Sequence, residues 1–286
     1  MYFSVIIPTC HRNDLLAQCL EKLAPGKQML QSSDYEVIVT DDGEYSTSRE
    51  MIARNFDWAR WTQGPGKGPA ANRNKGSKLA NGKFLVFTDD DCLPDPQWLI
   101  SFKEATYKYP EINIFEGKTY APSAQKSFNQ SAPINLQGNK LFSCNLCVHK
   151  QTFEDLKGFD ENFSFSYEDT EFAHRLKLLK IEHVFVNNAG VCHPWRRLGL
   201  NSWQSSYKQS KGIQTFLKKY PEELVHYNSL FFLKELPVSL VRDFIPKMIK
   251  YKWRGSFIII YHSIFYLYMV VLLFMPTVFS YLKKRA

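Results

Sequence analysis

Two kinds of apolar segment alternate along the N-terminal third of the chain, and this alternation restricts the fold more than any other feature. Short runs rich in Val, Ile and Phe have the pattern of strands buried on both faces, and they cover residues 3–8, 35–43 and 83–88. Helical spacing or composition is found at residues 14–23, 48–55 and 70–80, and in a segment that opens at Pro96. Strands that alternate with helices form parallel sheets covered on both faces. We therefore expect an α/β fold with a mostly parallel, Rossmann-like sheet and flanking helices.

Aspartates follow two of the predicted strands directly. "YEVIVTDDG" ends in Asp41 and Asp42, and "KFLVFTDDD" ends in Asp89, Asp90 and Asp91. Ligands of open α/β sheets bind beyond the carboxyl ends of the strands, so chemistry is expected here. Adjacent buried carboxylates are costly unless a cation neutralises them, and oxygen ligands suit Mg²⁺ or Mn²⁺. A solvated loop, or a cap for the helix after Pro96, is the alternative.

Charge and cysteine content narrow the choice of partners. The chain of 286 residues has a formal net charge of +8, which favours phosphates or an anionic membrane. Nucleic acid is not expected, because no DNA- or RNA-binding motif accompanies the charge. The start, "MYFSVIIPT", lacks the features of a signal peptide, so the N-terminal part is expected to be cytosolic with reduced thiols. Ordinary buried thiols are favoured over a zinc site, whose ligands would be Cys144, Cys147, Cys192 and His193.

The C-terminal part differs in composition from the rest. Residues 110–198 are mixed, with one clear helix at 167–179, and a helical region covers 201–220. Residues 221–254 mix aromatic and basic side chains, as interfacial segments do. Residues 255–282 form 28 positions without Asp, Glu, Lys or Arg, which is long enough to span a bilayer. We predict a catalytic domain at 1–220, an interfacial helical region at 221–254 and a transmembrane or membrane-embedded helix with a basic end at 255–286. A tail that lies in the interface or folds back, and an unusually apolar core helix, are the alternatives.

Six motifs together resemble family 2 glycosyltransferases, which are inverting enzymes of the GT-A fold. They occur in the family's order over residues 2–215: "SVIIPTCHR", "YEVIVTDDG", "GPAANRNKGSKLANGKFLVFTDDDCLPDPQWL", "CNLCVHKQTFEDLKGFDENF", "YEDTEFAHRL" and "VCHPWRR". The resemblance implies a GT-A-type sheet, a nucleotide-diphosphate sugar donor and a metal held at a D-x-D motif. Cys144, Cys10 and His11 depart from the family's usual residues, and these departures bear on the fit of donor or acceptor.

Positions that match the family's donor-binding residues lie at the predicted strand ends and helix start. The resemblance implies that Asp42 accepts the N–H of the nucleotide base, whereas a simple turn would be the alternative. Arg73 and Asn74 match a step near a helix N-terminus, where phosphate is favoured. The full predicted donor-binding set is Pro8, Thr9, Arg12, Asp42, Arg73, Asn74, Asp89 and Asp90.

The metal and the general base are also carried over by resemblance. Asp91 is the expected metal ligand, Asp89 turns to the ribose or the metal, and the role of Asp90 stays open. His193 matches a histidine near the metal or diphosphate, with a buried structural histidine as the alternative. Arg196 and Arg197 either approach the diphosphate or form a solvated turn.

Asp169, with its neighbour Glu168, matches the carboxylate that takes the acceptor's proton. The alternative is a capping box from Ser166 to Asp169, or a cap at Ser164.

These features predict a glycosyltransferase that acts on a glycan or lipid-linked acceptor. The basic, apolar tail favours the cytoplasmic face of the cell membrane as its location. A nucleotidyltransferase acting on sugar phosphates is the alternative enzyme, although it leaves Asp169 without a role. A non-catalytic nucleotide- or carbohydrate-binding membrane scaffold is the alternative without chemistry.

Overall fold

The computed structural model describes residues 1–45, 47–199 and 203–283, and the side chains of the last residues only as far as 274. The chain divides into two compact units. The first contains Met1–Pro122 and Ala132–Pro194, and the second contains Ser123–Ser131 and Trp195–Ala286. This division assigns residues 195–220 to the second unit, whereas the predicted catalytic domain ran to 220. The three functional segments predicted from the sequence stay predictions.

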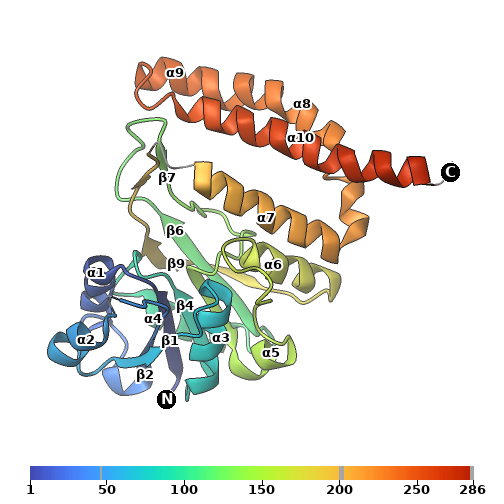
Figure 1. Cartoon of the computed structure of the whole chain (residues 1–286). Helices are drawn as coiled ribbons and strands as arrows, with labels where there is room; N and C mark the ends of the chain where they lie inside the picture. Colours follow the sequence, from blue (N-terminus) through green and yellow to red (C-terminus); the bar gives the residue numbers. More distant parts are fainter. Residues whose placement is uncertain (46, 200–202, 284–286) are drawn as a thin grey trace. The chain divides into compact units, whose positions relative to one another are not determined.

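An eight-stranded sheet forms the centre of the first unit, in the order β3-β2-β1-β4-β8-β6-β9-β5 (Figure 1). Its strands are β1 (Phe3–Thr9), β2 (Tyr35–Asp41), β3 (Arg60–Gln63), β4 (Phe84–Thr88), β5 (Leu93–Pro94), β6 (Ile114–Tyr120), β8 (Asn145–His149) and β9 (Val184–Cys192). The four neighbours β3, β2, β1 and β4 pair in parallel, and so do β6 and β9. β8 is antiparallel to both β4 and β6, and β5 is antiparallel to β9. The sheet is therefore mixed rather than mostly parallel.

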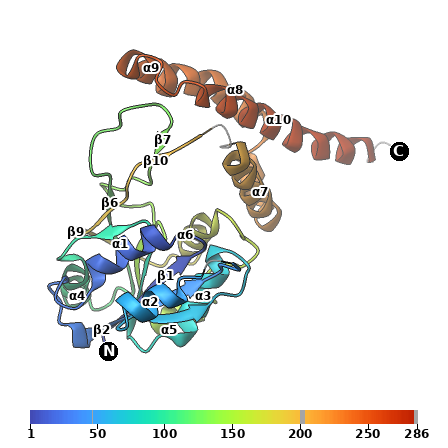
Figure 2. The ribbon, with the colours of Figure 1, turned by 60° about the vertical axis from the view of Figure 1, so that its left-hand side comes forward.

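Helices cover both faces of this sheet (Figure 1 and Figure 2). They are α1 (Asn13–Leu23), α2 (Arg49–Asn55), α3 (Pro69–Leu79), α4 (Trp98–Lys108), α5 (Lys150–Asp155) and α6 (Glu168–Leu178), with a 3₁₀ turn η1 (Ser32–Asp34) before β2. Successive side chains of a strand point to opposite faces. Along β1, Val5 and Ile7 accordingly join a core with α1, α2 and α4, while Ile6 joins a second core with α3, α5 and α6.

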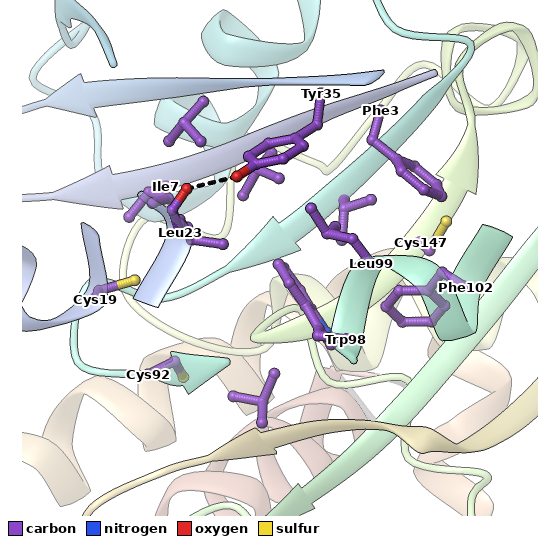
Figure 3. Packing of buried hydrophobic residues seen from close by; sticks show 14 of the residues in the cluster. Phe3, Ile7, Cys19, Leu23, Tyr35, Cys92, Trp98, Leu99, Phe102 and Cys147 are labelled. Atoms are coloured by element: carbon purple, nitrogen blue, oxygen red, sulfur yellow. Dashed lines mark hydrogen bonds between the residues drawn. The ribbon is translucent and has the colours of Figure 1, made fainter. Parts of the chain in front are cut away.

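The core on the α1 and α4 side is closely packed. Figure 3 shows Trp98 and Phe102 of α4 in the same core as Phe3 of β1, and all three side chains are fully buried. The Tyr35 hydroxyl donates a 2.8 Å hydrogen bond to the Leu23 carbonyl, which joins β2 to the end of α1 (Figure 3). This packing holds the carboxyl ends of β1, β2 and β4 side by side.

The six cysteines are all free thiols. Cys144 and Cys147 are buried, and the zinc site considered from the sequence is not formed among the described residues.

The second unit is mainly helical. It contains β7 (Gln130–Ser131), β10 (Arg196–Arg197), α7 (Trp203–Lys219), the 3₁₀ turn η3 (Pro221–Val225), α8 (Ser229–Ser239), the π-helical turn η4 (Leu240–Phe244), α9 (Ile245–Tyr251) and α10 (Ile258–Lys283). Part of the predicted helical region 201–220 lies outside the described residues, since 201 and 202 are not described. In the part of the chain that can be described, no helix combines the length and the apolar character needed to cross a bilayer.

Candidate active site

The loop after β4 places three aspartates at the carboxyl edge of the sheet. β4 lies between β1 and β8 in the middle of the sheet, so residues that follow it are enclosed by neighbouring loops. Asp90 is 2% exposed and Asp91 is 5% exposed, and the Asp89 side chain keeps 23% of its surface. The solvated-loop alternative is therefore wrong for Asp90 and Asp91.

Thr9 and Arg12 bind the acidic loop from the end of β1. The Thr9 hydroxyl donates a 2.8 Å hydrogen bond to Asp90, and the Arg12 guanidinium lies 2.9 Å from the other Asp90 oxygen. Arg12 also forms an ion pair with Asp91. Burial raises the pKa of Asp90 to about 6, because it outweighs the opposing effects of Arg12 and Thr9. Pro8 is buried in β1 beside them.

His193 meets Asp91 in the interior. Its Nδ1 lies 2.8 Å from the Pro194 carbonyl, which can only accept, so Nδ1 carries the proton. In the neutral ring, Nε2 then carries a lone pair, and this atom is 3.3 Å from an Asp91 oxygen. Nε2 is buried and has no hydrogen-bond partner within the described part of the chain. A lone pair that faces a carboxylate in this way favours a cation between them.

One further side chain joins this pair. The ligand atoms of Asp91, Cys92 and His193 all lie within 4.8 Å of one another. The residues present thus fit a divalent metal ion. Asp89, which the sequence also suggested as a ligand, is not part of this group, and Cys92 was not predicted.

Arg73 joins the acidic loop to α6. This arginine is 3% exposed, and it donates hydrogen bonds of 2.6 Å to Asp89 and 2.9 Å to Glu168. Burial opposes its charge, but Asp89 and Glu168 outweigh burial and raise the pKa of Arg73. α3 carries Arg73 close to the sheet because Gly76 faces β1, where a Cβ would lie 2.5 Å from the Ile6 side chain. Arg73 is thus a buried link between the two acidic segments.

Asp169 lies in the first turn of α6, next to that link. Burial and then the charge of Glu168 raise the pKa of Asp169 to about 6, while Arg73 and the Thr170 amide oppose the shift. Its carboxylate accepts a 2.7 Å hydrogen bond from the Thr170 amide. Tyr167 occupies the N-cap position with a φ of 76°, and its side chain makes no capping hydrogen bond. The capping alternatives at Ser166 and Ser164 stay predictions.

Asp42 organises the glycine loop that follows β3. Its two oxygens accept hydrogen bonds of 2.8 Å from the Gly66 amide and 2.9 Å from the Gly68 amide. A Cβ on Gly64 would lie 2.1 Å from an Asp42 oxygen and 2.2 Å from Oδ1 of Asn72. Like Nε2 of His193, Asn72 Oδ1 is buried without a hydrogen-bond partner in the described chain. An unsatisfied polar group therefore lies beside Asp42.

Asn74 and Asp41 have structural contacts that the sequence did not reveal. The Asn74 amide donates to the Phe159 carbonyl at 2.8 Å and accepts from the Phe159 N–H at 2.9 Å. Asp41 accepts from Gly43, Ser48 and Trp61, which accounts for its burial. The predicted contact of Asn74 with the donor stays a prediction. Arg196 and Arg197 are exposed in the second unit.

A mixed α/β sheet with buried carboxylates, arginines and a histidine at its carboxyl edge defines a transferase of the GT-A type. A model described as glycosyl transferase family 2 matches residues 4–146, half of the chain, so the chain belongs to this family of glycosyltransferases. A second model, described as the N-terminal domain of galactosyltransferase, matches residues 125–194. The predicted family and the predicted class of enzyme are confirmed.

The relatives match different lengths of the chain. Glycosyltransferase AglE of Haloferax volcanii is 28% identical over 213 residues, which is 69% of this chain and 68% of that protein. Validoxylamine A glucosyltransferase of Streptomyces hygroscopicus subsp. limoneus is 36% identical over 102 residues, which is 34% of this chain but only 22% of that protein.

The solved structure of Staphylococcus aureus TarS 1-349 in complex with UDP has a TM-score of 0.53 at 20% identity, covering 76% of this chain and 66% of that one. This likeness shows the fold.

Proposed function

We propose that this protein transfers a sugar from a nucleoside-diphosphate sugar to a hydroxyl group of a glycan or lipid-linked acceptor, with inversion at the anomeric carbon. The arrangement of Asp91 and His193 carries the proposal, because it fits a divalent cation at the edge of the sheet. The match to glycosyl transferase family 2 supports sugar transfer over nucleotidyl transfer. The intact set of buried acidic and basic groups argues against a non-catalytic scaffold.

Donor binding is assigned to the ends of β1 and β2. Asp42 and the glycine loop would receive the nucleotide base, and Asn72 lies beside them with an unsatisfied buried oxygen. Thr9 and Arg12 lie on the way to the acidic loop, where the diphosphate would sit. TarS binds UDP and UDP-GlcNAc, which supports a uridine donor for this chain as well.

A Mg²⁺ or Mn²⁺ ion is proposed at Asp91 and His193. When bound, it would supply positive charge to the departing diphosphate, which is the largest electrostatic need of this reaction. Asp89 lies two residues before Asp91 and pairs with Arg73, so it would reach the ion or the ribose only after leaving that pair. Arg12 holds Asp90 and Asp91 in place and would face the diphosphate with its exposed part.

Asp169 is proposed as the general base. A carboxylate whose pKa is raised to about 6 accepts a proton more readily than an ordinary one and is still deprotonated at neutral pH. Its link to the donor side runs through Glu168, Arg73 and Asp89. Glu168 is assigned to positioning, because its carboxylate is used in the pair with Arg73.

The proposed acceptor is based on relatives whose names specify a polymer. A poly(ribitol-phosphate) beta-glucosyltransferase of Bacillus spizizenii and a chondroitin synthase of Escherichia coli are among them, at 32% and 28% identity over parts of the chain. The first name specifies a polymer that receives a glucosyl group, and the second specifies a synthase of chondroitin. We propose a membrane-proximal polymer or lipid-linked glycan as acceptor, reached at the cytoplasmic face of the membrane.

Replacement of Asp169 by Asn tests the base assignment. Asp169→Asn should lower the transfer rate by about 10²–10⁴-fold, the usual contribution of a positioned base, with little effect on the Kd of the donor. In the unaltered protein the rate should rise with pH through about 6 and then level off, since the base must be deprotonated. Steady-state transfer with a uridine-diphosphate sugar and Mn²⁺, together with donor titration, measures both.

The exposed carboxylate of Asp57 offers a matched control, because it lies in the same unit away from the site. Asp57→Asn should leave the rate and its pH profile unchanged. Transfer by Asp169→Asn at the full rate would disprove that Asp169 is the general base. It would not contradict the proposed donor-binding site.

A further inference from the structure

The C-terminal segment folds back on itself as a helical hairpin. α8, η4 and α9 follow one another without a break, and α10 returns along them after a turn at residues 252–257 (Figure 1). Phe232 of α8 packs on Tyr266 of α10 at 6.0 Å, and Phe244 of η4 packs on His262 at 5.0 Å. These ring contacts define the inner side of the hairpin.

A row of apolar side chains runs along α10 away from those contacts. Its members are 39% to 62% exposed: Ile260, Ile264, Leu267, Tyr268, Val271 and Phe274. At ~100° per residue they fall within about 120° of the helix circumference, whereas Tyr266 faces α8 and His262 faces η4. α10 is thus apolar on the side that α8 does not cover.

The first arm of the hairpin, which consists of α8, η4 and α9, carries a second row of exposed apolar side chains. Its members are 45% to 78% exposed and recur three to five residues apart: Leu230, Leu233, Val238, Val241, Ile245 and Ile249. Scattered exposed apolar residues are normal, but continuous rows on two packed helices mark a surface that binds something apolar. Leu230, Leu233 and Val238 lie on the side of α8 opposite Phe232, which packs on α10, so the two rows form the outer sides of the hairpin. We call these two rows together the apolar surface of the hairpin.

The charges beside this surface indicate what binds it. Trp253 is 64% exposed in the turn, between the exposed Lys252 and Arg254, and Lys250 precedes them. No Asp or Glu follows Asp243 in the sequence, and Asp243 is paired with Arg242. Tryptophan and basic residues beside an apolar surface match the headgroup region of an anionic bilayer. A second copy of the chain would bring the same positive charges against one another.

We propose that the hairpin of α8 to α10 lies in the plane of an anionic lipid bilayer, with its apolar surface at the acyl boundary and its turn among the headgroups. This surface deepens the proposed membrane-proximal function by naming the lipid class and the residues that meet it. It does not depend on sugar transfer, because the residues involved are outside the catalytic site. Lipid binding and catalysis can therefore fail separately.

Co-sedimentation of the full chain with vesicles tests the proposal. Binding to vesicles of phosphatidylcholine with phosphatidylglycerol should exceed binding to phosphatidylcholine alone, and high salt should weaken it. Lys250→Gln with Lys252→Gln should lower the vesicle affinity by more than tenfold, at roughly fivefold for each basic residue. Ile249→Ser with Trp253→Ser should lower it on both kinds of vesicle.

Matched controls come from the first unit. The control variants are Tyr107→Ser, at a side chain that is 67% exposed, and Lys78→Gln, at an exposed lysine. Both variants should bind vesicles as the unaltered chain does. All hairpin variants should keep donor turnover in vesicle-free solution, which separates this test from that of the proposed function.

Three results would overturn the proposal. The first is vesicle binding that is absent, or that the hairpin variants leave unchanged. The second is a lipid-free dimer that Ile249→Ser with Trp253→Ser converts to a monomer, since a second copy would then cover the surface. The third is association that resists both high salt and alkaline carbonate, as expected of a spanning helix rather than one in the plane.

Discussion

Carboxylates at the edge of the sheet are held in different ways, and the difference separates structural from chemical roles. Asp41 accepts from three neighbouring residues and is 1% exposed, so it organises the turn after β2. Asp91 is paired with Arg12 and faces His193, where a cation fits. Asp169 accepts from the amide and hydroxyl groups of the neighbouring Thr170, and its pKa is raised to about 6, which suits a group that gains and loses a proton.

Glu116 is a buried carboxylate of a fourth kind, and it was not predicted. It is 1% exposed on β6 and accepts from the amides of Asn139, Lys140 and Leu141. His183 lies 3.3 Å from it. Burial alone would raise the pKa of Glu116, but His183 and the three amides outweigh burial and lower it to about 2.

Glu116→Gln should destabilise the protein in a pH-dependent way. Because the folded pKa lies below the ordinary value of 4.5, the carboxylate stabilises the fold fully above 4.5, and this stabilisation is lost as pH falls toward 2. The variant should lose about 3 kcal/mol at pH 7 and less at pH 3. Urea unfolding at both pH values measures the difference, with the exposed Glu111→Gln as control. An equal loss at both pH values would assign the effect to shape rather than charge.

At the scale of elements, the glycine loop between β3 and α3 connects two parts of the site. Gly66 and Gly68 both have positive φ angles, of 68° and 91°, and both donate to Asp42. A Cβ on Gly68 would lie 1.9 Å from the Ser164 carbonyl, whereas one on Gly66 would meet nothing within 4 Å. The loop is therefore packed at Gly68 against the segment that leads into α6.

The two glycines offer a matched pair of substitutions. Gly66→Ala should cost about 1 kcal/mol, the usual penalty for a side chain at positive φ. Gly68→Ala should cost more, and it should also weaken donor binding, because the loop must move away from Ser164. Thermal unfolding and donor titration of both variants measure these effects. Equal losses in the two variants would show that the close approach to Ser164 has no consequence for the site.

The elements that sequence predicted well are those with local signals. The run Phe84–Thr88 and the helical spacing of Trp98, Leu99 and Phe102 indicate β4 and α4 without any long-range information. β3 was missed because "RWTQ" has no apolar run, and it forms a strand only by pairing with β2. The antiparallel position of β8 depends on pairing with β4 and β6, which no local pattern reveals, so the sheet was expected to be mostly parallel.

The same division applies to the site. Motif order indicated Asp42, Asp91, Asp169 and His193, while the link from Arg73 to Glu168 joins residues 95 positions apart and needs the fold to be seen. Cys92 and Asn72 could have been noticed, since one adjoins the aspartates and the other precedes Arg73, but neither residue type signals a ligand by itself. Glu116 carries no sequence signal at all.

At the scale of the whole molecule, charge is distributed unevenly. The chain has a net charge of +8, yet the edge of the sheet combines five carboxylates, at 89, 90, 91, 168 and 169, with two arginines, Arg12 and Arg73. A local excess of negative charge requires compensation, and the divalent cation proposed at Asp91 and His193 would supply it. The hairpin carries the opposite excess, which the proposed lipid surface would neutralise.

The most direct test of this account is the binding of UDP to the full chain with and without Mn²⁺. We expect Mn²⁺ to lower the Kd of UDP, and saturation at about 100 times that Kd should add about 2.7 kcal/mol of stability in thermal unfolding. Asp91→Asn and His193→Ala should abolish the effect of Mn²⁺, while Asp57→Asn should retain it. UDP binding of equal strength without Mn²⁺, or an unchanged effect of Mn²⁺ in those two variants, would contradict the assignment of the acidic edge as the metal and diphosphate site.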